Sequence, residues 1–233
     1  MYDLDMPLGD RMKYYEILTQ MELPENTFAI IRLDGKNFSK YTRKLTRPFD
    51  SLFHEDMVAT ARLLCKEISG VKYAYTQSDE ISLFLDDRDK PETQWWYGGN
   101  VQKITSISAA MASVNFSVAR DGIAYFDSRV FVLPNQIEVD NYLLWRRHDC
   151  EKNAVSMAAA VHFSQRELHG KSTEERRSML LEEGIDFDDY PNGFRHGTMI
   201  TKQEMVWLVN GVPLEGPRSE WVATALDDSM ITR

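Results

Sequence analysis

The order of the elements that the sequence predicts indicates an α+β fold. Between residues 28 and 133, patterns typical of strand, helix, strand, strand, helix and strand follow one another. This βαββαβ order is that of ferredoxin-like domains, and we expect an antiparallel sheet with its helices on one face. Hydrophobic residues make up 43% of the 233 residues and charged residues 27%, so the chain can build a sizeable packed core.

The first strand and the first helix have clear boundaries. Residues 28–33, with the sequence FAIIRL, form a compact apolar run that predicts a buried strand ending at Asp34-Gly35. Asp50 is a suitable N-cap for a helix that reaches about Ser69, because apolar residues recur there every three or four positions. Gly70 then marks the end of that helix.

The middle of the chain completes the core pattern. Residues 71–75 and 81–85 are rich in strand formers, and the short connection between them predicts a hairpin. A second helix is predicted over about residues 100–119, where many small side chains allow close approach to a sheet. Residues 126–133 predict the fourth strand, which Pro134 ends.

From residue 135 onward the pattern predicts additional helices and a small β-hairpin region. Asn135 is expected to cap one helix, and a separate helix is expected over residues 153–164. Ser172 and Glu175 form a capping box for a helix that ends at Gly184. Shorter features follow: a turn at 190–193, strands at 198–202 and 205–209, and a turn at 210–211. The last twenty residues receive no assignment.

Composition excludes several classes of protein. The formal charge of −9 argues against a protein that coats nucleic acid non-specifically, because such affinity comes from many basic residues. The two cysteines, Cys65 and Cys150, are not in a C-x-x-C pair, so neither a disulfide framework nor a thiolate metal site is expected. Because no secretory signal and no long apolar run are present, we expect a cytoplasmic protein without a membrane partner. Hydrolase and dehydrogenase motifs are absent too.

Carboxylates mark the candidate site. Asp34 follows the first strand, while Asp79 and Glu80 lie in the predicted hairpin turn. In the predicted sheet the first strand lies beside the hairpin, so these acids could converge at one edge. Mg²⁺ is usually held by one or two carboxylates plus substrate phosphates, and two such ions can serve phosphoryl transfer. The same residues are also ordinary turn formers, and spacing alone slightly favours that interpretation.

A second feature is a basic strip, which we define as residues 32–47. It holds six basic residues and one acid, so its net charge is +5 and the rest of the chain carries −14. Such a strip after a candidate metal carboxylate suits a triphosphate. A solvated basic loop explains the pattern equally well.

Two longer motifs surround the candidate carboxylates: Arg32-Leu33-Asp34-Gly35-Lys36-Asn37-Phe38 and Gln77-Ser78-Asp79-Glu80-Ile81-Ser82. They resemble motifs of the histidine-tRNA guanylyltransferase family, in particular of its bacterial-type, guanylyltransferase-like members. Further similar segments lie at residues 126–131, 142–146 and 167–172, and the resemblance extends from residue 8 to about residue 202. Two long motifs in the right order make the resemblance specific.

The resemblance implies a polymerase-type palm that adds nucleotides to the 5′ end of tRNA in the 3′-to-5′ direction, with ATP and GTP as substrates. Residues 1–134 would be the palm-like catalytic core, and residues 135–233 an extension packed on the same domain. Asp34, the Gly35 carbonyl and Asp79 would bind two Mg²⁺ ions, with Glu80 assisting. The residues implied for nucleotide binding are Lys36, Asn37, Phe38 and Ser39 through their backbone, together with Arg47, Ser78 and Lys103.

One departure from the family bears on the RNA substrate. Eukaryotic members carry His-Ile-Asn-Asn after an Asp-Cys pair, whereas Asp149-Cys150 is followed here by Glu151-Lys152-Asn153-Ala154. This difference favours templated repair of 5′-truncated tRNA over addition of one G to histidine tRNA. Family resemblance also implies a homo-oligomer, commonly a tetramer. The candidate RNA contacts are Arg146, Arg147, Lys152, Asn153, Arg195 and Lys202.

Two other functions remain open from the sequence. A palm of this kind could make a cyclic nucleotide without RNA. Alternatively, the chain could be a non-catalytic RNA-binding module, although retention of Asp34, Asp79 and Glu80 together argues against a pure binder.

Overall fold

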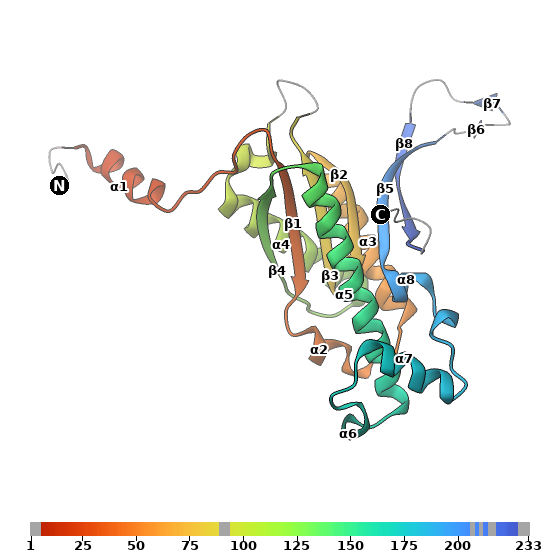
Figure 1. Ribbon diagram of the computed structural model, residues 1–233. Helices are drawn as coiled ribbons and strands as arrows, with labels where there is room; N and C mark the ends of the chain where they lie inside the picture. Colours follow the sequence, from red (N-terminus) through yellow and green to blue (C-terminus); the bar gives the residue numbers. More distant parts are fainter. Residues whose placement is uncertain (1–5, 89–93, 206–207, 210–211, 214–217, 228–233) are drawn as a thin grey trace.

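A six-stranded antiparallel sheet forms the centre of the molecule (Figure 1). The computed structural model describes residues 6–88, 94–205, 208–209, 212–213 and 218–227. The strand order is β4-β1-β3-β2-β5-β8, and a separate pair, β6 and β7, lies outside this sheet. The strands are β1 (Phe28–Gly35), β2 (Val71–Gln77), β3 (Glu80–Asp86), β4 (Phe126–Leu133), β5 (Thr198–Met205), β6 (Leu208–Val209), β7 (Val212–Pro213) and β8 (Arg218–Ala225).

The predicted βαββαβ core is confirmed. Strands β1 to β4 take the order β4-β1-β3-β2, and the two helices that connect them pack on one face of this sheet. The helices of the described chain are α1 (Leu8–Ile17), α2 (Phe38–Tyr41), α3 (Ser51–Glu67), α4 (Val101–Arg120), α5 (Gln136–His162), α6 (Gln165–Leu168), α7 (Thr173–Glu182) and α8 (Asn192–His196). Asp50 caps α3 as predicted, since its side chain accepts a hydrogen bond from the Phe53 amide.

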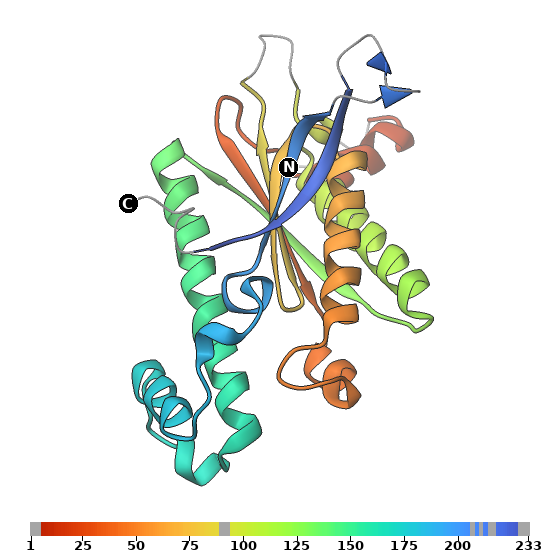
Figure 2. The same ribbon diagram turned by 90° about the vertical axis from the view of Figure 1, so that its right-hand side faces the viewer.

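The helical extension after residue 134 covers the second face of the sheet, opposite the two core helices. Figure 2 shows α3 and α4 on one side of the sheet and α5 on the other. Strand β1 is accordingly buried on both faces: Ala29 and Ile31 belong to the cluster with α3 and α4, whereas Phe28 and Ile30 pack with Val139 and Tyr142 of α5. Burial on both faces explains why the strand is a continuous apolar run instead of an alternating one.

The two helices predicted between residues 135 and 164 are one helix. α5 spans 27 residues from the Asn135 cap to His162. The stretch between Trp145 and Asn153 is mostly charged and has no apolar face of its own, which is why sequence periodicity does not detect it. In the fold this stretch continues as helix because its polar side chains find tertiary partners, which are described below.

The end of the chain also differs from its prediction. Strand β5 runs without a break from Thr198 to Met205, and the predicted turn at 190–193 is instead the start of α8. The last twenty residues, which had no assignment, contain the whole of β8, an edge strand paired with β5 from Thr198↔Ala225 to Met205↔Arg218. The predicted turn at residues 210–211 lies outside the described residues.

Helix α1 stands apart from the rest of the molecule. None of its residues is buried, and it extends away from the sheet (Figure 1). Among the helices of the described residues, none combines the length and apolar character needed to cross a membrane.

Candidate active site

The end of strand β1 meets the turn between β2 and β3. Asp34 lies opposite Glu80 in the antiparallel register, and the Gly35 amide donates a hydrogen bond to the Asp79 carbonyl at 3.1 Å. The predicted convergence of the strand end and the hairpin turn is therefore present in the fold. Ser78 adopts a positive φ of 48° in this tight turn, and its hydroxyl donates to Asp79 Oδ1 at 3.2 Å.

Asp34 and Asp79 form a pair of uncompensated acids. Burial raises the pKa of the Asp79 carboxyl above its ordinary value, and the nearby charge of Asp34 raises it further. Neither carboxylate is in an ion pair with a described residue. Two repelling carboxylates where β1 ends and β3 begins fit a divalent cation, whose charge would relieve the repulsion.

The acids at this edge do not form a complete metal cage. Within the described residues, no group of three or more His, Cys, Asp or Glu side chains is placed to hold a metal ion. A site made from Asp34, Asp79 and a backbone carbonyl leaves positions for water and phosphate oxygens. That open arrangement is the one in which Mg²⁺ is commonly bound beside nucleotides.

Gly35 has a steric reason to be glycine. A Cβ at this position would lie 2.4 Å from ring atoms of Phe38. The Phe38 ring is buried and packs at 5.1–6.0 Å, between ring centroids, from Phe53, Phe116 and Phe126. The side chain of Phe38 therefore belongs to the core, and only its backbone remains a candidate for nucleotide binding.

Glu80 is held by two arginines. Arg146 on α5 donates to both of its carboxylate oxygens, from Nε at 2.7 Å and from Nη2 at 2.8 Å, and Arg32 Nη2 lies 2.6 Å from Oε2. Burial raises the pKa of the Glu80 carboxyl, and the two guanidinium groups oppose that effect. An assisting role of Glu80 beside the metal ligands stays a prediction, and in this geometry both of its oxygens accept hydrogen bonds from arginine.

The expectation that Arg146 is a surface RNA contact is wrong. Its side chain is only 5% exposed, and besides Glu80 it donates to Asp149 Oδ2 at 2.8 Å. The Asn153 amide donates to the same carboxylate oxygen at 3.1 Å. Arg146, Asp149 and Asn153 are spaced at i, i+3 and i+7, so they form one polar stripe along α5.

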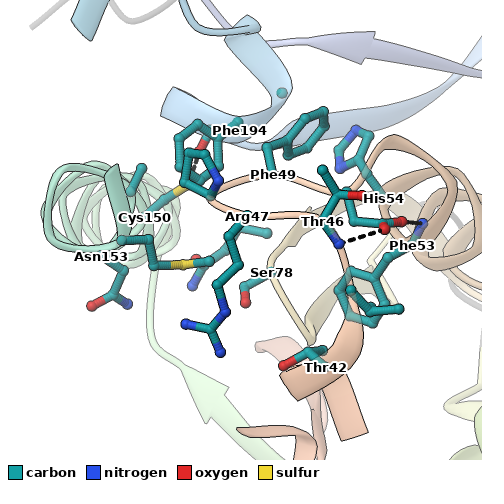
Figure 3. A pocket seen from close by; sticks show the side chains of 17 residues that line it. Thr42, Thr46, Arg47, Phe49, Phe53, His54, Ser78, Cys150, Asn153 and Phe194 are labelled. Carbon is teal, nitrogen blue, oxygen red and sulfur yellow. Dashed lines mark hydrogen bonds between the residues drawn. The ribbon is translucent and has the colours of Figure 1, made fainter. Parts of the chain in front are cut away.

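A pocket of about 110 Å³ opens beside this stripe (Figure 3). Its wall includes Ser78 from the β2–β3 turn and Asn153 from α5, and in Figure 3 the guanidinium of Arg47 lies between these two side chains. The remaining wall is largely apolar and aromatic, with Phe49, Phe53, Met157 and Phe194. The pocket thus combines an apolar wall with the cation of Arg47 and several polar side chains, and Asp50 also lines it.

A sequence profile of the tRNAHis guanylyltransferase (Thg1) family matches residues 9–134, just over half of the chain. The chain belongs to this family. An uncharacterized protein of Acanthamoeba polyphaga mimivirus is 30% identical over 230 residues, covering 86% of this chain and 78% of its own length. The chain spans 65% of the length of a probable tRNA(His) guanylyltransferase of Mus musculus, which is 26% identical over 200 residues, 76% of this chain.

Solved structures of the family have the same fold. A bacterial tRNA(His) guanylyltransferase (Thg1)-like protein in complex with ATP superposes with a TM-score of 0.85 at 35% identity, covering 94% of this chain and 92% of that one. A bacterial Thg1-like protein in complex with GTP gives a TM-score of 0.80 at 35% identity, covering 97% and 92%. Members of the Thg1 family are nucleotidyltransferases.

Some of the predicted nucleotide-binding residues of this Thg1 family chain gather near the pocket and others do not. Ser78 and Arg47 line the pocket, and Lys36, Asn37 and Ser39 are exposed next to Gly35. The Lys36 amide, however, donates to the Tyr125 carbonyl at 2.8 Å, so it is not free for a phosphate.

Lys103 lies away from the carboxylates within the chain. On α4, the Ser113 hydroxyl accepts a hydrogen bond from the Phe126 amide, and Phe126 pairs with Gly35. Lys103 precedes Ser113 by ten residues, which is about 15 Å along a helix. The structure of one chain therefore does not bring Lys103 to the candidate site.

The predicted RNA contacts are dispersed. Lys152, Asn153 and Lys202 are exposed, and Arg147 is half-buried. Arg195 is 11% exposed, and its guanidinium donates to Asp188, to Asn192 and to the Tyr190 carbonyl, which makes it a local structural link. If the sequence had predicted one continuous helix over residues 136–162, the spacing of Arg146, Asp149 and Asn153 would have placed these three side chains on one face of it.

Proposed function

We propose that the protein is a Mg²⁺-dependent nucleotidyltransferase that extends the 5′ end of tRNA in the 3′-to-5′ direction. The observation that carries the proposal is the uncompensated pair Asp34 and Asp79 at the sheet edge, next to a pocket lined by Ser78 and Arg47. Family membership supports nucleotidyl transfer to tRNA, and the relatives solved with ATP and with GTP support nucleoside triphosphates as substrates.

Asp34, Asp79 and the Gly35 carbonyl would hold the Mg²⁺ ions, two of them in the proposed mechanism. When bound, Mg²⁺ neutralises phosphate charge and stabilises the attacking and leaving oxygens. The chain contributes the placement of its ligands: the hydrogen bond from Gly35 to Asp79 fixes the two backbones, and the Ser78 hydroxyl orients one carboxylate oxygen. Glu80 contributes indirectly, as the anchor for Arg32 and Arg146.

The nucleotide would bind across the pocket and the basic strip. The apolar wall with Phe49 suits a base, while Arg47 and Ser78 at its edge suit phosphate oxygens. Lys36, Lys40, Arg43, Lys44 and Arg47 of the strip are exposed, and none is in an ion pair with another described residue. These free cations can therefore neutralise a triphosphate or an RNA end.

The reaction follows in two steps. An oxygen of the RNA 5′-monophosphate attacks the α-phosphorus of ATP and releases pyrophosphate, which gives an adenylylated 5′ end. The 3′-hydroxyl oxygen of an incoming nucleoside triphosphate then bonds to the 5′ phosphorus of the RNA, and the bond to AMP breaks. The residues named above act by positioning and charge neutralisation, as is general for phosphoryl transfer.

Repair of 5′-truncated tRNA is the form of the reaction that we propose. The reason is the sequence Glu151-Lys152-Asn153-Ala154, which replaces the His-containing motif of eukaryotic members. A tetrameric assembly and the division into a catalytic core (1–134) and an extension (135–233) stay predictions.

A single assay tests this function. The protein is incubated with Mg²⁺, ATP and a tRNA that lacks its first nucleotide, and each nucleoside triphosphate is supplied separately. We expect incorporation only of the nucleotide that pairs with the opposing base of the acceptor stem. Addition of G whatever the opposing base would instead indicate histidine-tRNA guanylylation. A cyclic nucleotide formed without RNA would indicate a cyclase, and binding without any product would indicate an RNA-binding module.

A further inference from the structure

We propose that Trp145 is a stacking platform for a base at the 5′ end of the RNA substrate. The inference rests on the proposed function, because it names how the second substrate of that reaction is held. Trp145 was not among the candidate contacts from sequence, and the pocket in Figure 3 does not include it.

The indole of Trp145 is exposed on one side and supported on the other. Its exposed fraction is 54%, which is high for a tryptophan in a folded core helix. The guanidinium carbon of Arg146 lies 4.4 Å from the ring centroid and that of Arg32 lies 5.8 Å away. Because Glu80 fixes both arginines, the indole rests on a rigid base and loses little freedom when it binds a ligand.

The platform borders the catalytic carboxylates. Arg32 precedes Asp34 by two residues on β1, so both side chains point to the same face of the sheet, about 7 Å apart along the strand. Arg146, under the indole, binds Glu80, which lies opposite Asp34 in the register. A base stacked on Trp145 would therefore be close to the place where a 5′ phosphate has to react.

The two proposed substrates need separate sites on either side of the carboxylates. The pocket beside Ser78 and Asn153 is walled and small, which suits one nucleotide. Trp145 lies eight residues before Asn153 on α5, about 12 Å along the helix axis, and it faces solvent. An open, flat aromatic suits a base of a polymer, since base stacking on aromatics is a general mode of RNA recognition.

A cation next to the platform suits the RNA backbone. Arg129 on β4 is the cross-strand partner of Arg32, so it projects on the same face of the sheet. Its side chain is 54% exposed, and its ion pair with the equally exposed Asp127, at 3.1 Å, is of the kind that contributes little to stability. Arg129 can therefore exchange this partner for a phosphate while the base stacks on Trp145.

The first experiment uses intrinsic fluorescence of the full chain. Wild type and Trp145→Phe are titrated separately with tRNA lacking its first nucleotide and with Mg²⁺-GTP alone. We expect RNA to quench a component of the wild-type emission that Trp145→Phe lacks, and GTP alone not to quench it. A quench of the same component by GTP alone would place the nucleotide, not the RNA, on Trp145 and would overturn the proposal.

The second experiment measures affinity. Stacking of one base is worth about 1–3 kcal/mol, so Trp145→Ala should weaken RNA binding about five- to a hundredfold, while Trp145→Phe should restore most of it. The affinity for Mg²⁺-GTP should stay unchanged in both variants. Arg129→Gln should reduce the slope of log RNA affinity against log salt concentration by about 1, the value for one phosphate contact.

The controls separate a local effect from misfolding and from failure of the proposed function. Val161→Ala changes another exposed apolar residue of α5, and it should leave RNA affinity unchanged. Unchanged RNA affinity in Trp145→Ala, or a loss of GTP affinity in that variant equal to its loss of RNA affinity, would overturn the stacking role. If wild type binds the RNA with the expected quench but adds no nucleotide, the proposed function fails while the stacking role stands.

Discussion

Asp79, a proposed metal ligand, lies in an environment that opposes its ionisation. Its carboxyl is buried beside Asp34, and both burial and the like charge raise its pKa. The folded protein therefore binds a proton at Asp79 more tightly than the unfolded chain does. The stability of the metal-free protein should fall as pH rises from the ordinary value of 3.8 through the raised pKa, because ionisation is costlier in the folded state.

The substitution Asp79→Asn tests this conflict. In EDTA at pH 7 we expect its Tm to exceed that of wild type, with each kcal/mol of gain worth about 2–4 °C. The rate of nucleotide addition with Mg²⁺ should fall at least about a hundredfold, because a carboxylate proposed to hold Mg²⁺ is lost and bound Mg²⁺ supplies several kcal/mol of charge stabilisation to the transition state. Differential scanning calorimetry and the tRNA extension assay measure the two effects.

A matched control for Asp79→Asn is Asp127→Asn. Asp127 lies opposite Asp34 in the β1–β4 register, but its side chain is 54% exposed. Its substitution should change the free energy of unfolding by less than about 0.5 kcal/mol. A lower Tm for Asp79→Asn than for wild type, or normal addition of nucleotide, would contradict the assignment of Asp79.

At the scale of elements, helix α5 joins the sheet to the rest of the site. The hydroxyl groups of Tyr142 and of Ser82 on β3 form a hydrogen bond of 2.8 Å, and Arg146 binds Glu80. Further along the helix, Asn153 lines the pocket. Local periodicity predicts only the two ends of this helix, because its middle is polar. The ion pair between Arg146 and Glu80 anchors this polar middle part to the sheet. Because the local sequence carries no signal for that contact, sequence reasoning divides the helix and assigns Arg146 to the surface.

Breaking the pair between α5 and β3 should be costly. Removing one partner of a buried ion pair typically costs about 3–5 kcal/mol, and Arg146→Met should approach this range from below because Arg32 still contacts Glu80. In the double variant with Glu80→Gln, the loss should be smaller than the sum of the single losses. Urea unfolding of the two single variants and the double variant measures the coupling.

Lys152→Met provides the comparison for Arg146→Met. Lys152 is exposed on the same helix, so its substitution should alter the free energy of unfolding by no more than about 0.5 kcal/mol. Strict additivity of the Arg146 and Glu80 effects would show that their bidentate contact does not stabilise the fold.

At the scale of the whole molecule, charge is separated between the basic strip and the remainder. The total charge is −9, yet five of the six basic residues in the strip are exposed near the end of β1. Arg32 is the exception, because its side chain is only 19% exposed and is paired with Glu80. The protein can therefore attract one RNA end locally while the rest of its surface repels polyanions.

Salt dependence of RNA binding tests this arrangement. Each phosphate contact contributes a slope of about −0.7 to −0.9 in a plot of log affinity against log salt concentration. The double substitution of Lys40→Gln and Lys44→Gln should reduce the slope by about 1.5 and weaken binding of truncated tRNA. The control is Lys171→Gln, because Lys171 lies outside the strip and is paired with Glu175 four residues further along; this variant should leave the slope unchanged. Equal slopes for all variants would exclude the strip as the RNA contact.

From the amino-acid pattern alone we could predict the βαββαβ core, the position of Asp34 and Asp79 at two neighbouring turns, and the resemblance to the family. These features are local or periodic, so strand composition, helix caps and short motifs are enough to show them. Four features become visible only in the folded molecule: the single α5 on the second face of the sheet, β8 as the edge strand, the ion pairs of Glu80 with Arg32 and Arg146, and the exposure of Trp145. Each of these depends on contacts between residues far apart in the chain, and a linear pattern carries no signal for a polar side chain whose partner lies 66 positions away.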